Sequence, residues 1–68
     1  MAREYTNSQI EYLIDEWIHN KRHRRILKLH YIDGETIEKI AEDKEVDRTP
    51  RQVSNILEKC SAELWRHL

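Results

Sequence analysis

The sequence predicts an all-α fold, a small domain of four helices, from three observations. Apolar residues recur at helical spacing along most of the 68-residue chain. No segment alternates apolar and polar residues as a half-buried strand would. Threonines stand where helices would need N-caps. Because 37% of the residues are charged and Phe is absent, the chain suits one compact unit with a thin core, so residues 1–68 are expected to form a single domain.

The first helix is expected at about residues 8–19. Thr6 and Gln9 have the spacing of a capping box, in which each side chain accepts a hydrogen bond from the other residue's backbone N–H. One apolar face follows, made of Ile10, Leu13, Ile14, Trp17 and Ile18. Trp17 is therefore expected in the core.

Two further helices are expected next, at about residues 21–32 and 37–44. In the first of them the apolar surface comes from Ile26, Leu27, Leu29 and Tyr31. Gly34, the single glycine, suits a left-handed helix stop. Thr36 offers an N-cap to the next helix, where Ile37, Ile40 and Ala41 share one face.

The fourth helix is expected at residues 50–66, after a connection in which Val46 is a candidate for burial. Thr49 suits the N-cap, Pro50 the first helical position and Gln52 a second capping box. The core stripe would be Val53, Ile56, Leu57, Cys60 and Leu64. Trp65 and Leu68 lie beyond that stripe, where the C-terminal helix could support a homodimer.

Composition and charge restrict the classes of function. A single cysteine excludes an internal disulfide, and the absence of a signal-like start favours a cytoplasmic protein. No stretch approaches the roughly 20 apolar residues that span a bilayer. The net charge of −1 argues against an indiscriminate polyanion binder, yet residues 21–31 carry +5 and residues 32–47 carry −5. Such zoning lets a near-neutral protein present basic surface to phosphate.

Three patterns follow one another in a fixed order: a helix that ends in the pattern of Leu27 to Gly34, a Thr-apolar-Glu pattern from Thr36 to Ala41, and a final helix from Val53 to Leu57. With these patterns, residues 21–66 resemble the promoter-binding fourth region of bacterial RNA polymerase sigma factors, and the size is similar to small phage and mobile-element relatives. The resemblance implies a helix-turn-helix over residues 36–66 whose recognition helix begins at Thr49-Pro50. It also implies a DNA-binding transcription regulator that works with RNA polymerase at promoters.

Candidate contacts to double-stranded DNA follow from side-chain chemistry and from this resemblance. Arginine suits guanine edges, and glutamine or asparagine suits adenine edges. The base-facing candidates on the fourth helix are Arg51, Gln52, Ser54 and Asn55. The phosphate candidates are Arg22, Arg24, Arg25, His30, Arg48, Thr49 and Lys59. The resemblance places base contacts on Arg51, Ser54 and Asn55 and backbone contacts on Lys59, Arg22 and His30, where histidine replaces the usual arginine.

Two departures from the sigma pattern affect the expected docking. The turn contains Lys44-Glu45 where the family has a glycine or another small residue, and the chain from Ala41 to Val53 is two residues longer than usual. The angle at which the fourth helix would meet DNA therefore differs from the family pattern. The basic run at residues 21–25 has a plainer interpretation as a solvated helix start, and the acidic segment 35–47 is expected to face away from DNA.

Other functions are less well supported by the residues. No nucleophile has a fitting histidine and carboxylate, and no glycine-rich phosphate loop occurs, so the chain is expected to be neither an enzyme nor a cofactor binder. His19 and His23 are spaced for a metal on a continuous helix but lack further ligands nearby. Two alternatives remain: an adaptor that binds RNA polymerase or a sigma factor without touching DNA, and a DNA-binding accessory protein of phage packaging or recombination.

Overall fold

The computed structural model describes residues 6–67 and contains four helices and no strand in that range. The helices are α1 (Asn7–Trp17), α2 (Lys21–Tyr31), α3 (Ile37–Glu42) and α4 (Pro50–Arg66). The predicted all-α class with four helices is confirmed, and each helix end lies within two residues of its predicted position. The largest differences are that α1 and α3 each end two residues earlier than predicted.

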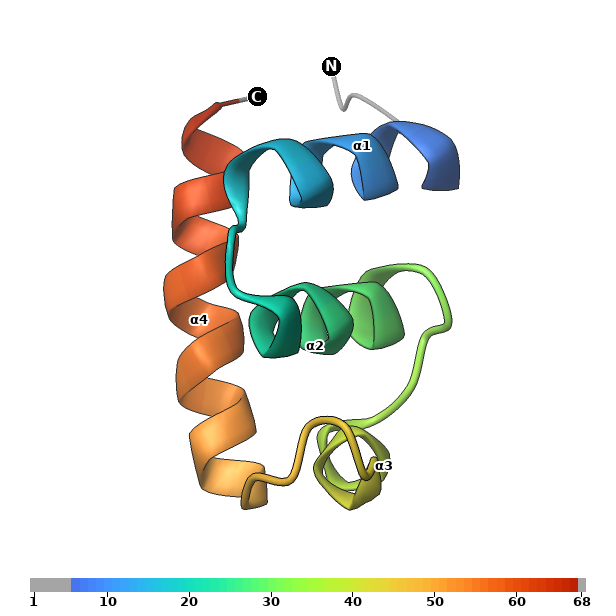
Figure 1. Ribbon diagram of the computed structural model, residues 1–68, viewed down its shortest axis with the longest axis vertical. Helices are drawn as coiled ribbons and strands as arrows, with labels where there is room; N and C mark the ends of the chain where they lie inside the picture. The colour runs from blue at the N-terminus through green and yellow to red at the C-terminus, as the bar shows by residue number, and fades with distance from the viewer. Residues whose placement is uncertain (1–5, 68) are drawn as a thin grey trace.

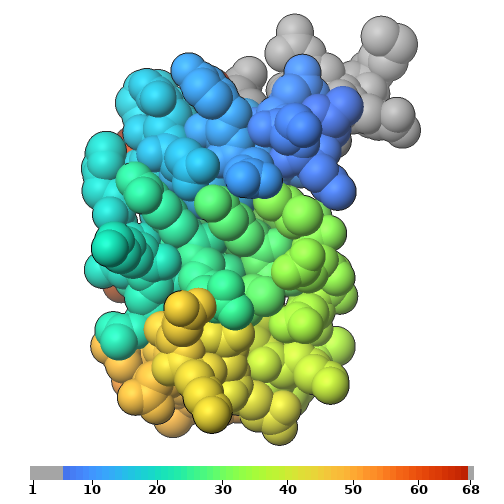
Figure 2. All heavy atoms as spheres, turned by 45° about the vertical axis from the view of Figure 1, so that its right-hand side comes forward, coloured from blue at the N-terminus to red at the C-terminus, as the bar shows by residue number. Residues whose placement is uncertain are grey.

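The helices form two layers. In Figure 1, α1 and α2 run antiparallel, one above the other, while α4 runs past their ends along one side. The short α3 lies beyond α2 and is seen end-on, so its axis crosses that of α4 steeply. Each of the other three helices packs against α4. Figure 2 shows α1, α2 and α3 as one continuous face that hides most of α4.

Local capping explains where the helices begin. The predicted capping boxes are confirmed at Thr6 with Gln9 and at Thr49 with Gln52, and Thr36 caps α3. The N-cap of α2 is Asn20, whose side-chain oxygen accepts from two backbone N–H groups of the first turn. Each cap satisfies backbone donors that the first helical turn leaves without an intrahelical acceptor.

The core is apolar and lies where the three-helix layer meets α4. No polar or charged side chain of the described residues is buried. The predicted burial of Val46 and of Cys60 is confirmed, as is most of the α4 stripe. The buried side chains are Ile14, Ile18, Ile26, Leu27, Leu29, Ile40, Val46, Val53, Leu57, Cys60 and Leu64.

The prediction that Trp17 is a core residue is wrong. Its side chain is 39% exposed, because α1 ends at this residue and the chain turns Ile18 inward instead. The indole lies at the rim and stacks on His67. Trp65 is also exposed, and the predicted role of Leu68 lies outside the described residues.

Left-handed backbone angles occur in two of the connections that the structure describes. Gly34 has φ of +69°, which confirms the predicted helix stop, and Asp47 has φ of +46° in the connection between α3 and α4. Aspartate tolerates this region better than most non-glycine residues. Within residues 6–67, no helix combines the length and apolar character that crossing a membrane requires.

Candidate nucleic-acid interface

The outer surface of α4 carries the predicted base-facing residues. All four are exposed, while Val53 and Leu57 of the same helix are buried. At 3.6 residues per turn, Arg51 and Asn55 lie opposite the buried stripe, and Ser54 and Gln52 fall on its two flanks. The four candidates are therefore accessible, but only Arg51 and Asn55 share the central strip of this surface.

The first turn of α4 uses two of the predicted contact residues in its own cap. The Thr49 hydroxyl accepts from the Gln52 backbone N–H at 3.2 Å, and the Gln52 side-chain oxygen accepts from the Thr49 N–H at 3.2 Å. The Thr49 hydroxyl keeps its proton for donation, and the Gln52 amide keeps its NH₂ group. Both side chains are held in place by the cap and retain donors suited to phosphate or base acceptors.

Two predicted phosphate contacts from separate elements come together around His23. This half-buried histidine of α2 faces α4, with Nδ1 3.6 Å from Sγ of Cys60. Burial lowers the pKa of His23, and the positive charges of Arg22 and Arg48 lower it further. Both arginines therefore lie within electrostatic reach of this imidazole, Arg22 from α2 and Arg48 from the connection that leads into α4.

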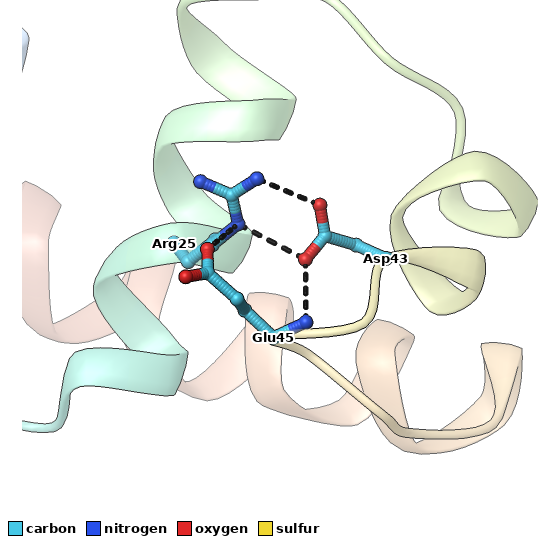
Figure 3. A network of polar contacts seen from close by, with 3 residues as sticks. All are labelled: Arg25, Asp43 and Glu45. Atoms are coloured by element: carbon cyan, nitrogen blue, oxygen red, sulfur yellow. Dashed lines mark hydrogen bonds and ion pairs between the residues drawn. The ribbon is translucent and has the colours of Figure 1, made fainter.

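Arg25 is engaged in a network with two acids of the α3–α4 connection (Figure 3). Its Nε and Nη2 donate to the two carboxylate oxygens of Asp43 at 3.0 and 2.8 Å, and Nε lies 2.7 Å from a carboxylate oxygen of Glu45. The hydrogen bond from Arg25 holds the pKa of Asp43 below its usual value. Part of the basic charge of α2 is thus neutralised by acidic side chains of segment 35–47 in the same chain.

Arg24 and His30 lie apart from the start of α4. The Nε of Arg24 donates to the backbone oxygen of Ile18 and its Nη2 to that of Asp15, at 3.2 Å, so the guanidinium binds the end of α1. His30 is exposed near the far end of α2, edge-on against Tyr31. The seven phosphate candidates therefore divide into a group near the start of α4, two arginines engaged in internal contacts, and two outlying residues, His30 and Lys59.

Sequence reasoning missed the internal partners of Arg24 and Arg25. Nothing local in the sequence pairs residue 25 with residue 43, since the ion pair depends on how α3 packs on α2. For the N-cap of α2 the sequence did contain a signal, because Asn20 is of a residue type preferred at that position.

Among residues 6–67, no group of three or more His, Cys, Asp and Glu side chains could hold a metal. The helix α2 begins at Lys21, so His19 and His23 do not share a helix.

In comparisons with known proteins, no family model, curated protein or solved structure matches the chain. The resemblance to sigma region 4 expected over residues 21–66 has no support beyond the sequence patterns named above.

Proposed function

We propose that the chain is a sequence-specific, non-enzymatic DNA-binding regulator in which α3, the connection 43–49 and α4 act as a helix-turn-helix. The observation that carries this proposal is the surface of α4. Opposite its buried stripe, the helix exposes Arg51, Asn55 and Lys59, and the basic residues around His23 flank its start. A single α-helix fits the major groove of B-DNA, so α4 is the element proposed to enter it.

The chemistry of this surface suits base reading. Arg51 can donate two hydrogen bonds to a guanine edge, and Asn55 can both donate to and accept from an adenine edge. Their spacing of four residues separates them by about 6 Å along the helix axis, so they would meet neighbouring base pairs. Arg22, Arg48 and the Thr49 hydroxyl would bind phosphates alongside, which sets the position of the helix without reading sequence.

A promoter is the proposed setting for this binding, together with RNA polymerase. That part rests on the sigma-like patterns from Leu27 to Gly34 and from Thr36 to Ala41. The connection between α3 and α4 is longer than in the sigma pattern. The position of α4 in the groove is therefore proposed from this structure and not from the family.

Duplex binding measured across salt concentrations tests the proposal. Fluorescence anisotropy with promoter-like and random duplexes should show affinity falling steeply with salt and a preference among sequences. Arg51→Ala should weaken specific binding by about 1–3 kcal/mol. Arg66→Ala is the matched control, since it removes the same charge from an exposed site at the other end of α4. Absence of binding to any duplex at low salt would refute the proposal.

A second candidate function is an adaptor that binds RNA polymerase or a sigma factor without contacting DNA. The observation favouring it is that Glu38 and Glu42 are exposed on α3, next to α4, in a chain of net charge −1. Acidic side chains there would repel a duplex if they faced it. Binding to purified polymerase without DNA, unaffected by Arg51→Ala, would favour the adaptor.

A further inference from the structure

The connection between α3 and α4 is built on Asp43. Its backbone oxygen accepts from the N–H groups of Val46 and Asp47 at 3.1 and 2.9 Å, and its carboxylate accepts from the N–H of Glu45 at 2.9 Å. Val46 is fully buried and anchors the middle of the segment. Only Asp47 and Arg48 separate this anchor from Thr49, the N-cap of α4.

The same carboxylate joins this connection to α2. Arg25 binds it with two parallel hydrogen bonds and also contacts Glu45 (Figure 3). The Asp43 side chain is 18% exposed and that of Arg25 44% exposed, so the pair is partly shielded from solvent. A bidentate pair is directional in a way that a point-charge contact is not.

We propose that Arg25 is a positioning residue that clamps the α3–α4 connection onto α2 and so sets the angle at which α4 presents its outer surface to DNA. This inference rests on the proposed function. It gives Arg25 a role different from the direct phosphate contact expected from the sequence. Val46 is the one residue of segment 43–49 that is buried in the core, so the Arg25–Asp43 pair gives this segment a second tie to the rest of the molecule.

The two roles predict opposite effects for a change at Asp43. If Arg25 binds phosphate, Asp43→Asn removes a competing negative charge and duplex affinity rises. If Arg25 is a clamp, the same change weakens the bidentate pair and affinity falls, by about two- to fivefold for an ordered pair of this exposure. Asparagine is isosteric and can still accept from the Glu45 N–H, so the turn itself is preserved.

Asp15→Asn is the matched control. Asp15 pairs with Lys28 at 3.0 Å between α1 and α2, so the variant removes the same charge from a surface ion pair away from the connection. Its affinity gives the general effect of removing one acidic charge. Affinity of Asp43→Asn below that of Asp15→Asn supports the clamp, and affinity equal to it or above it overturns the clamp.

Two further variants separate positioning from simple loss of charge. Arg25→Lys keeps the charge but loses the bidentate geometry, so a clamp predicts reduced affinity with an unchanged salt slope, whereas a phosphate contact predicts nearly unchanged affinity. Combining Arg25→Ala with Asp43→Asn should weaken binding no more than Arg25→Ala alone, because without the guanidinium Asp43 has no clamp contact left to lose. Additive losses would contradict the proposal.

Amide hydrogen exchange of the free protein provides a measurement that does not depend on DNA. The N–H groups of Glu45, Val46 and Asp47 should exchange faster in Arg25→Ala and Asp43→Asn than in the unmodified chain or Asp15→Asn. If no duplex binds, the proposed function fails, and exchange alone decides whether the clamp exists. Unchanged exchange in both clamp variants would refute it.

Discussion

Trp17 and His67 stack face to face, with ring centroids 3.6 Å apart and planes inclined by 5°. The stack joins the last residue of α1 to His67, the C-cap of α4, so it ties the C-terminal ends of these two helices together. A double-mutant cycle with Trp17→Ala and His67→Ala should give a coupling free energy of about 0.5–1.5 kcal/mol in urea unfolding. The pair Tyr12→Ala and His67→Ala is the control, since Tyr12 is 66% exposed, and its effects should add.

The fate of Trp17 shows which parts of the fold a sequence can reveal. The capping boxes at Thr6 and Thr49 depend on residues three apart, and the α4 stripe depends on helical spacing, so both were predictable from local pattern. Whether Trp17 is buried or exposed depends on where α1 ends relative to α4, and that is a property of the tertiary structure. Asp47 is a second example, since its left-handed backbone, next to buried Val46, is not announced by a glycine in the sequence.

In the candidate interface, too, some features could be predicted from the sequence and others could not. Exposure of Arg51 and Asn55 followed from the phase of the apolar stripe, which a sequence contains. The internal partners of Arg24 and Arg25 could not be predicted, because the carbonyl oxygens of α1 and the carboxylate of Asp43 reach α2 only in the folded chain. A run of basic residues therefore indicates available charge, while the tertiary structure decides which of those charges remain free for a ligand.

The contact between Tyr31 and Ser61 links α2 to α4 through side-chain oxygens 2.6 Å apart. Replacing Tyr31 by Phe removes one hydroxyl and keeps the ring, which packs edge-on against Trp65. The free energy of unfolding should fall by about 0.5–1.5 kcal/mol. Urea denaturation measures this, with Tyr12→Phe as a control on an exposed tyrosine. An equal loss in both variants would mean that the hydrogen bond does not stabilise the packing of α2 on α4.

Asp47 allows a test of backbone strain in the connection. Its φ of +46° is unfavourable for a β-branched side chain, so Asp47→Val should lower the free energy of unfolding by about 1–2 kcal/mol. Asp47→Gly should be close to neutral, because relief of strain offsets the greater freedom of glycine in the unfolded chain. Thermal and urea unfolding of both variants check the pair. If valine were tolerated as well as glycine, the left-handed conformation would not persist in solution.

His23 should make stability depend on pH. Because burial and the nearby arginines lower its pKa in the folded chain below 6.5, the folded state binds the proton less readily than the unfolded state. The His23 contribution is therefore complete above the unfolded pKa and is lost as pH falls through 6.5 toward the folded value. Arg22 and Arg48 are charged groups that act on His23, and Glu63 lies near its neighbour Cys60, where burial raises the pKa of the thiol and the charge of Glu63 raises it further.

Unfolding free energies between pH 5 and 8 measure this effect. His23→Gln should reduce the decline toward pH 5, while His19→Gln, which removes a histidine exposed between α1 and α2, provides the control. Equal slopes for His23→Gln and the unmodified chain would show that His23 does not cause the decline. The range stays above pH 5 so that titration of Asp43, whose pKa is also lowered, does not enter.

The proposed DNA-binding face predicts different salt dependences for neighbouring arginines. Removing one side chain that binds a phosphate should reduce the slope of log affinity against log salt by about 0.9. Arg22→Ala and Arg48→Ala should each show that reduction, because both side chains lie in the basic group near the start of α4. Arg24→Ala should leave the slope unchanged and lower stability instead, since its guanidinium binds the backbone oxygens at the end of α1.

Each of the three variants removes one positive charge, Arg22 and Arg24 from the first turn of α2 and Arg48 from the connection that leads into α4. The loss of net charge is the same in all three, so it cannot produce different salt slopes. Titrations of one duplex from about 50 to 200 mM salt cover a range in which the removal of a single phosphate-binding group is measurable. A slope for Arg24→Ala reduced as much as that for Arg48→Ala would place the duplex on the α1–α2 side of the molecule. In that case α4 would not be the helix in the groove, and Arg51→Ala should then have no effect on sequence preference.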